Sequence, residues 1–427
     1  MAELLHATPS PEPVREEPQA IDPDLVRLIT QLGSQLVDSG EATSDVEALL
    51  REVAGVFGAP DISCLVLPTG ILVQVEGPHG PTTQISRAGR DPLRLDQIGA
   101  VDRLVKTLLQ GRTTLAEARR RLDDIEAAPP RFGTVTTVLG HTILSLGFGV
   151  VLNPSQAALP AYIGLGALVG LLRATAERAT TLRTALPVLC SFVVTILSIE
   201  VLAPAVGDDP VRIAAPALVS FLPGAALTTA TIELTHGQVV SGASRLVYGL
   251  SQLLLLTFGV VAAYAVASVE AVEAPGAQLG AWSPWLGIAL VAVGDVLFAS
   301  APKGSVWWIA LALYAAFAAQ AVGSAVLSPQ LSGFVGGLAI VPVARLIARA
   351  PGGPPPMVTT RPAFWLLVPG ALGFIGVSQV ATMSQSGIDD LINMGLALFA
   401  IALGVLTGTG LTQEARSIQR SIRAIGR

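Results

Sequence analysis

Long apolar runs dominate the chain after about residue 132, whereas the first 130 residues mix short apolar stretches with charged ones. A helix that spans a bilayer needs about 20 mostly apolar residues. Ten runs meet or approach that length, namely residues 133–152, 157–172, 186–206, 212–232, 245–268, 285–301, 305–327, 331–349, 363–382 and 388–411. The pattern therefore predicts an α-helical polytopic membrane protein with about ten spans.

The front of the chain has the periodicities of a small α+β domain. Residues 1–20 are rich in Pro and Glu and are expected to be disordered. Within residues 21–130, apolar spacing predicts helices over 24–39, 43–57, 95–110 and 114–127, and strands over 62–67, 71–75 and 82–86. Thr43 or Ser44 is expected to cap the second helix.

Charge separates the same two regions. Only 13% of the 427 residues are charged, against about a quarter in soluble domains. Residues 1–130 hold 20 of the 31 acids and 12 of the 26 bases. The net charge of −5 indicates no nucleic-acid partner. Neither a phosphate-binding loop nor a metal-ligand pattern occurs, so the sequence predicts no cofactor and no metal.

Basic residues fix the expected orientation, because loops on the cytoplasmic side carry an excess of Lys and Arg. With the front domain in the cytoplasm, Arg212 is the one base after residue 130 that falls in an outer segment. The inner segments hold thirteen, namely Arg131, Arg173, Arg178, Arg183, Arg245, Lys303, Arg345, Arg349, Arg361, Arg416, Arg420, Arg423 and Arg427. Both termini are therefore expected in the cytoplasm, with residues 412–427 as a basic tail.

Two spans carry a Pro-Gly pair, Pro223-Gly224 and Pro369-Gly370. Such a pair interrupts a helix, and lipid tolerates the freed backbone groups only where they face protein or water. The pairs stand 146 residues apart, and Gly147 and Gly294 stand 147 apart. This register predicts two five-span repeats, residues 131–270 and 285–411, which must be inverted because five is odd. Matched breaks in inverted repeats point to the midplane site of a transporter.

Several short motifs match a known family in their order and spacing. They are Asp38-Ser39-Gly40-Glu41, Val101-Asp102-Arg103-Leu104, Leu122-Asp123-Asp124-Ile125, Phe221-Leu222-Pro223-Gly224, Ser241-Gly242-Ala243-Ser244-Arg245-Leu246 and Leu367-Val368-Pro369-Gly370. The chain thereby resembles the threonine/serine exporter family, whose members join a soluble domain to ten spans. The resemblance implies a bacterial cytoplasmic-membrane protein that exports threonine and serine, driven by protons. The oligomeric state stays open.

The breaks supply the candidate substrate-binding residues, Ser220, Pro223, Gly224, Thr228, Pro369 and Gly370. The half-helix after each break directs its positive dipole end toward a substrate carboxylate. The alternative is a kink that serves packing only.

Three ionisable residues within spans are candidates for proton coupling. Asp295 is the strongest, because a charged carboxylate in a bilayer costs about 3 kcal/mol; alternatively it reaches water or Lys303. His141 titrates near neutral pH or simply hydrogen-bonds a helix carbonyl. Glu200 is the third candidate, or it reaches outer water.

A candidate inner gate follows the first broken span, formed by Glu233, His236 and Arg245; the alternative is a set of solvated loop residues. The acids Asp38, Glu41, Asp45 and Glu47 are expected to form a solvated face rather than a ligand site. Glycine pairs spaced as GxxxG, such as Gly333 and Gly337, are assigned to helix packing.

A channel-like or sensory protein, in which the front domain binds a ligand and gates the pore, stays open from the sequence, and so do two other functions. One is a membrane-anchored enzyme with a catalytic front domain, although ten spans exceed what an anchor needs. The other is a dicarboxylate exporter, which needs two cationic contacts in its cavity. The bases considered for those contacts are Arg212, Arg245 and Arg345, near span ends, and their position favours a zwitterionic substrate.

Overall fold

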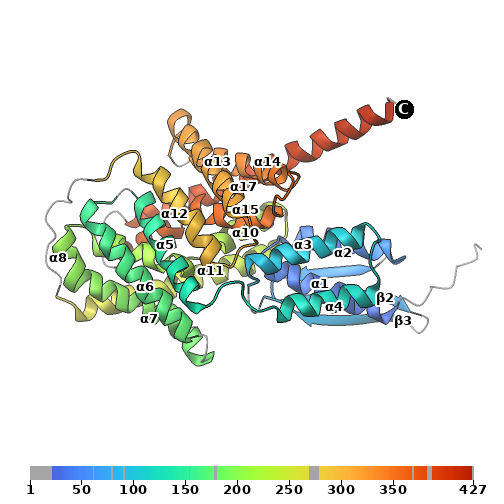
Figure 1. Cartoon of the computed structure of the whole chain (residues 1–427), viewed down its shortest axis with the longest axis horizontal. Helices are drawn as coiled ribbons and strands as arrows, with labels where there is room; N and C mark the ends of the chain where they lie inside the picture. Colours follow the sequence, from blue (N-terminus) through green and yellow to red (C-terminus); the bar gives the residue numbers. More distant parts are fainter. Residues whose placement is uncertain are drawn as a thin grey trace, which may run out of the picture.

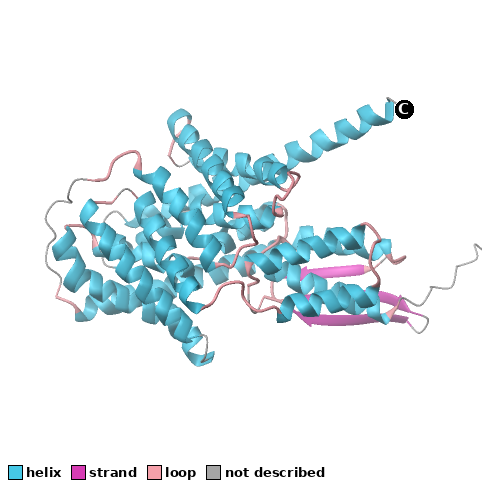
Figure 2. Ribbon diagram, viewed as in Figure 1, coloured by secondary structure: helices cyan, strands magenta, loops and turns pink. Residues whose placement is uncertain are grey.

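A computed structural model of the chain describes residues 22–60, 62–77, 80–89, 92–152, 154–176, 180–268, 278–329, 331–367, 370–381 and 387–425. The front domain, defined here as residues 22–130, lies at one end of the molecule and the helices of the membrane part at the other (Figure 1). Strands are confined to the front domain (Figure 2).

The front domain is an α+β unit, as the sequence predicts. Its elements are α1 (Pro23–Asp38), α2 (Thr43–Val56), β1 (Ser63–Leu67), β2 (Gly70–Gly77), β3 (Gly80–Arg87), α3 (Leu95–Leu109) and α4 (Leu115–Ala127). The three strands form an antiparallel sheet in the order β1-β2-β3. The predicted apolar face of α1 is buried through Leu25, Leu28, Leu32 and Leu36, and the helix packs against β2.

The membrane part is helical throughout its described residues. Its first half contains α5 (Thr134–Val151), η1 (Gln156–Ala158), α6 (Leu159–Ala176), α7 (Thr180–Leu197), η2 (Ser198–Leu202), α8 (Ala203–Val206), α9 (Pro210–Ala214), η3 (Ala215–Phe221), α10 (Gly224–Thr235) and α11 (Val239–Val266). Its second half contains α12 (Ser283–Phe298), α13 (Val306–Val326), α14 (Ser332–Ile347), α15 (Pro356–Leu367), α16 (Gly370–Ala381) and α17 (Gly387–Ile425).

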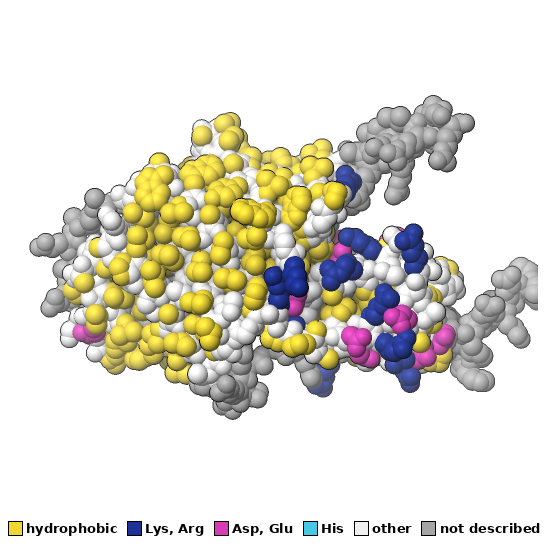
Figure 3. All heavy atoms as spheres, in the orientation of Figure 1, with side chains coloured by type: hydrophobic (Ala, Val, Ile, Leu, Met, Phe, Trp, Pro, Cys, Tyr) yellow, Lys and Arg dark blue, Asp and Glu magenta, His cyan; other side chains and the backbone are white. Residues whose placement is uncertain are grey.

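Helices occupy all ten predicted apolar segments. Six helices among the described residues are long and apolar enough to cross a membrane, and a seventh span results if the bent pair Pro210–Phe221 and Gly224–Thr235 is one. The apolar helices α12 and α14 are shorter, at 16 residues each. Hydrophobic side chains cover the visible face of the membrane part, whereas charged ones gather over the front domain (Figure 3). The chain is a polytopic membrane protein.

The fourth apolar segment is broken where the sequence places the first Pro-Gly pair. The helix η3 ends at Phe221, Leu222 is extended, and α10 begins at Gly224 with its axis bent by 66°. Proline at position 223 lacks a backbone N–H, so the chain loses one helical hydrogen bond there. In the second half, α15 ends at Leu367 and the described part of α16 begins at Gly370. Pro369 lies outside the described residues.

Glycines let α5 and α12 pack side by side at backbone distance. A Cβ at Gly140 would lie 2.5 Å from the backbone nitrogen of Phe298, and one at Gly147 would lie 2.7 Å from that of Val291. Residue numbers rise along one helix as they fall along the other, so the two helices are antiparallel. The GxxxG glycines of α14 and α17 also face each other's backbone, as the sequence predicts.

Candidate functional site

A cavity of about 250 Å³ that contains ionisable side chains lies where the membrane helices meet the front domain. It is lined by side chains of α6, η3, α12 and α15, together with one segment of the front domain. The lining residues are Pro92, Leu93, Arg94, Leu95, Arg173, Ser220, Asp295, Phe298, Ala299, Arg361, Pro362 and Trp365. The cavity therefore combines two halves of the membrane part, two arginines from membrane helices, one carboxylate and two aromatic walls.

Asp295 is the acid of this cavity. It lies in the last turn of α12 and is 3% exposed, and its Oδ2 has no hydrogen-bond partner among the described residues. The guanidinium of Arg361 acts on it electrostatically. Lys303, the partner of the alternative interpretation, is exposed and does not line the cavity. A buried carboxylate with an open oxygen is suited to bind a cation or a proton.

His141 connects α5 to the same cavity through Ser220. The His141 ring is buried, with Nδ1 2.9 Å from the Gly166 carbonyl and Nε2 2.9 Å from the Ser220 hydroxyl. A carbonyl only accepts, so Nδ1 carries the proton, and the neutral ring accepts from Ser220 through Nε2. The Ser220 oxygen also receives a long contact of 3.4 Å from Arg173. The carbonyl partner that was the alternative for His141 is therefore present, and proton coupling by His141 stays a prediction.

Two arginines line the cavity at positions that the sequence analysis did not consider for this role. Arg173 lies in the last turn of α6 and stacks on two aromatic rings. Its Cζ is 4.8 Å from the ring centroid of Phe221 and 5.3 Å from that of Phe298. Arg361 of α15 donates to the Leu93 carbonyl at 2.8 Å. The expectation that only Arg212, Arg245 and Arg345 are available is therefore wrong. Folding brings together bases that the sequence assigns to separate loops.

The front domain contributes part of the cavity wall. The segment from Pro92 to Leu95 lines it, and the Leu95 amide donates to the Ala299 carbonyl at 3.1 Å. Arg131, just after the front domain, donates to the Ala301 carbonyl at 2.6 Å. The front domain and the membrane part therefore line this cavity together.

Two of the three predicted gate residues form a buried ion pair. Arg245 Nε lies 3.1 Å from Glu233 Oε2, and the Glu233 side chain is fully buried. Glu233 Oε1 also accepts from the Thr43 amide at 3.0 Å, while Arg245 donates to the Glu41 carbonyl at 3.2 Å. His236 instead contacts the carbonyl of Ile232 in its own helix. The pair joins the membrane part to the front domain.

This contact corrects the predicted cap of α2. The N-cap residue is Ala42, without a side-chain hydrogen bond, so neither Thr43 nor Ser44 caps the helix. The Glu233 carboxylate instead accepts from the Thr43 amide. Nearby, burial and the charges of Asp45 and Asp102 raise the pKa of Glu41 to about 7. Two further acids of the predicted solvated face bond to backbone amides, since Asp38 accepts from the Gly89 amide and Glu47 from that of Val66.

The other predicted residues lie apart from the cavity. Pro223 and Gly224 are buried at the break, and Thr228 is buried in α10 with a hydroxyl that has no partner among the described residues. Glu200 is exposed and accepts from the Ser268 amide at 2.8 Å. Gly370 begins α16. Of the substrate candidates, Ser220 lines the cavity; of the proton-coupling candidates, Asp295 lines it and His141 contacts it.

The sequence carried a weak signal for the residues that were missed. Arg173 directly follows an apolar run, and Arg361 stands directly before a proline and the ninth apolar run. A base at such a boundary is equally expected from the positive-inside rule. Their position in a cavity therefore depends on tertiary structure.

A multi-span helical protein with a cavity that contains ionisable side chains between its membrane helices belongs to the class of membrane transporters. The chain matches the threonine/serine exporter family over residues 27–267, more than half its length, and it belongs to that family. A threonine/serine exporter of Corynebacterium glutamicum is 25% identical over 144 residues, which are 33% of this chain and 29% of the relative. The matched region thus spans less than a third of that relative's length. No solved structure matches the chain.

Proposed function

We propose that the protein is a secondary active exporter of threonine and serine across the bacterial cytoplasmic membrane. The observation that carries the proposal is the charge arrangement of the cavity. Arg173 and Arg361 offer donors to a carboxylate, Asp295 offers an acceptor to an ammonium group, and Ser220 offers a partner to a side-chain hydroxyl. A volume of about 250 Å³ suits a small amino acid, since sites for drug-sized ligands begin at about 300 Å³.

Alternating access of two inverted halves is the proposed mechanism, and the packing of α5 against α12 supports it. A shift of 147 residues makes Gly140 correspond to Gly287 and Gly147 to Gly294. Their contacts with the partner helix correspond by the same shift. Gly147 meets the nitrogen of Val291, and Gly294 meets that of Leu144, at 2.7 and 2.4 Å from the built Cβ atoms. Reciprocal contacts of this kind are expected when a two-fold axis relates two repeats.

The break supports the same proposal. Ser220 and Arg173 belong to the first half of the membrane part, whereas Asp295 and Arg361 belong to the second. A substrate held between them would contact both halves at once. Rocking of the halves about the break at Pro223-Gly224, and about the corresponding pair Pro369-Gly370, would then expose the substrate to either side in turn.

Proton coupling is assigned to Asp295 and His141. A protonated Asp295 has no charge to hold an ammonium group, so proton uptake would release the substrate. Protonation of His141 would turn Nε2 into a donor toward Ser220, so that the serine hydroxyl would become free to donate elsewhere. Glu200 stays a candidate at a distance from the cavity.

The orientation follows from the basic residues. Thirteen of the fourteen bases after residue 130 fall on the side of the front domain, which we place in the cytoplasm. The Glu233–Arg245 pair would then lie at the cytoplasmic end of the broken segment. There it would act as an inner gate that the front domain reinforces through Thr43 and Glu41.

Dicarboxylate export is the second candidate, because two arginines line the cavity. Asp295 argues against it, since an ionised carboxylate in the cavity repels a dianion. A membrane-anchored enzyme is disfavoured by the family, whose name describes exporters.

Counterflow in proteoliposomes tests the proposal. Labelled threonine, serine and succinate are compared with and without a pH gradient. We expect uptake of threonine and serine that responds to the gradient, and the Asp295→Asn variant should lose that response while still inserting. Asp208→Asn, an acid outside the cavity, is the matched control. Faster counterflow of succinate than of threonine would replace the amino-acid proposal by the dicarboxylate one.

A further inference from the structure

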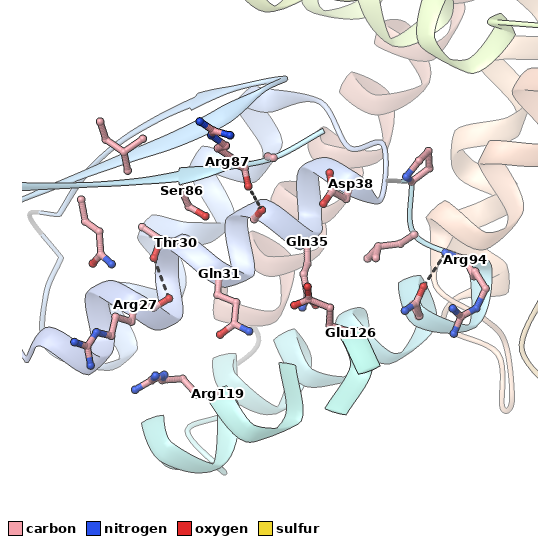
Figure 4. A pocket seen from close by; sticks show the side chains of 17 residues that line it. Arg27, Thr30, Gln31, Gln35, Asp38, Ser86, Arg87, Arg94, Arg119 and Glu126 are labelled. Carbon is pink, nitrogen blue, oxygen red and sulfur yellow. Dashed lines mark hydrogen bonds between the residues drawn. The ribbon is translucent and has the colours of Figure 1, made fainter. Parts of the chain in front are cut away.

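A second and larger cavity lies within the front domain. Its volume is about 970 Å³, and it opens between α1, α4 and the edge strand β3. Figure 4 shows Gln31, Gln35, Arg119 and Glu126 in the space between the two helices, with Ser86 and Arg87 on the strand above. We call it the front groove. A cavity of this size falls within the range of small-molecule sites.

The front groove is rich in cationic groups. Four arginines line it, Arg27, Arg87, Arg94 and Arg119, against two carboxylates, Asp38 and Glu126. Some of this charge is already compensated within the domain. Arg119 and Arg27 share Asp24, at 2.6 and 3.4 Å, and Arg94 pairs with Asp96 at 3.1 Å.

Arg87 lies on the edge strand β3 next to Ser86, which pairs with the buried Ile71 and therefore faces α1. Because successive side chains of a strand alternate, the Arg87 side chain points to the other face of the sheet.

Other polar groups of the groove have unsatisfied hydrogen-bonding atoms. Gln35 is 5% exposed and donates from its amide nitrogen to the Leu122 carbonyl at 3.2 Å, while its Oε1 is buried without a partner in the part of the chain that the structure describes. The Nε of Arg119 is likewise buried without a partner among those residues. Unsatisfied buried donors and acceptors are costly in a folded protein unless another group binds there.

We propose that the front groove binds a small organic anion, with Arg119 facing the anionic group and Gln35 Oε1 accepting from a donor on the same molecule. The groove is separate from the membrane cavity, and the proposal does not depend on which solute the membrane part carries.

The position of the groove makes it a regulatory site. Pro92, Leu93 and Arg94 line both the front groove and the membrane cavity. Within this shared wall the Leu93 amide donates to the Asp38 carbonyl at 3.0 Å, and the Leu95 amide donates to the Ala299 carbonyl. A molecule that fills one side of the wall therefore restricts the motion of a segment whose other side faces the proposed transport cavity.

Binding to the full-length protein in lipid nanodiscs is the first test. Citrate and adenosine monophosphate are titrated as probes, one with carboxylates and one with a phosphate. We expect at least one to bind. Its affinity should fall about tenfold in Arg119→Gln, the loss expected for one charge-assisted hydrogen bond. Arg112→Gln, an exposed arginine outside the groove, is the matched control and should bind as the wild type does.

Amide hydrogen exchange is the second test. Addition of the bound probe should slow exchange at Leu93 and Leu95 in the wild type but not in Arg119→Gln. The proposal is overturned if neither probe binds, or if Arg119→Gln and the double variant Arg27→Gln/Arg119→Gln both bind the probe as tightly as the wild type does. Binding that leaves exchange at Leu93 and Leu95 unchanged would overturn the regulatory role. None of these measurements involves transport, so their failure is distinct from failure of the exporter proposal.

Discussion

The Glu233 carboxylate accepts a hydrogen bond of 3.0 Å from the backbone amide of Thr43, a residue 190 positions earlier in the chain. Thr43 is the first residue of α2, so a membrane helix supplies the cap of a helix in the front domain. A carboxylate at a helix N-terminus is favoured by the free amides and by the helix dipole. Since Arg245 neutralises the same carboxylate, one buried acid joins three segments.

Glu233→Gln should destabilise the protein by about 2 kcal/mol, because it leaves Arg245 largely buried without its counter-charge. The amide oxygen still accepts from Thr43, so the loss reports the charge pair. Thermal unfolding in detergent measures it. The double variant Glu233→Gln/Arg245→Met should be more stable than Glu233→Gln alone. Glu117→Gln, in an exposed pair, is the control; equal losses in both acids would contradict the buried-pair interpretation.

Alanine at Gly147 or Gly294 should lower stability by about 1–3 kcal/mol each, the usual cost of overpacking. The added methyl group would meet backbone atoms of the partner helix at 2.7 and 2.4 Å, and backbone cannot move aside as a side chain can. Gly164→Ala is the matched control, because a Cβ there meets nothing within 4 Å. Unfolding midpoints near that of Gly164→Ala would show that α5 and α12 are not in close backbone contact.

Stability should fall as pH rises from about 4.5 to 7, because burial raises the pKa of Glu41 from 4.5 to about 7. In that window the folded protein binds more protons than the unfolded one, and the effect reaches at most about 3 kcal/mol. Above pH 7 both states are ionised and this dependence ends. Unfolding midpoints at pH 5 to 8 should therefore change less in Glu41→Gln than in the wild type or in Glu52→Gln, an exposed control.

Ser220→Ala should weaken threonine transport, because it removes the hydroxyl between His141 and the cavity. Loss of one neutral hydrogen bond predicts a rise of about fivefold in the half-saturation concentration. The pH dependence of counterflow should also change, since His141 would lose its link to the solute. Ser244→Ala, an exposed hydroxyl bonded to its own helix, is the control. Unchanged concentration and pH curves in Ser220→Ala would remove this serine from the site.

Local patterns predicted the elements well, because their causes are local. The apolar face of α1 and the break at Pro223 follow from side-chain periodicity and from a missing amide. The sequence also singled out Asp295 as a candidate site residue, since a lone acid in an apolar run is costly in lipid. These features depend on residues close to one another in sequence.

The composition of the cavity depends on long-range packing and was predicted only in part. Arg173 and Arg361 look like ordinary loop bases until α6 and α15 converge. Nothing in the sequence marks residues 92–95 as part of the cavity wall. They are held there by hydrogen bonds from the Leu95 amide to the Ala299 carbonyl and from the Arg361 side chain to the Leu93 carbonyl. Thr43 misled the prediction for the same reason, as its partner lies in a distant helix.

The front domain forms two sets of hydrogen bonds with the membrane part. Thr43 and Glu41 are fastened to the helices of the first half, and Leu93 and Leu95 to those of the second. Because both halves are hydrogen-bonded to the same domain, they cannot slide past each other unless one set of these bonds breaks. If the halves move relative to each other during transport, one set of hydrogen bonds would have to break in every cycle. The weaker set would then determine the rate of the cycle.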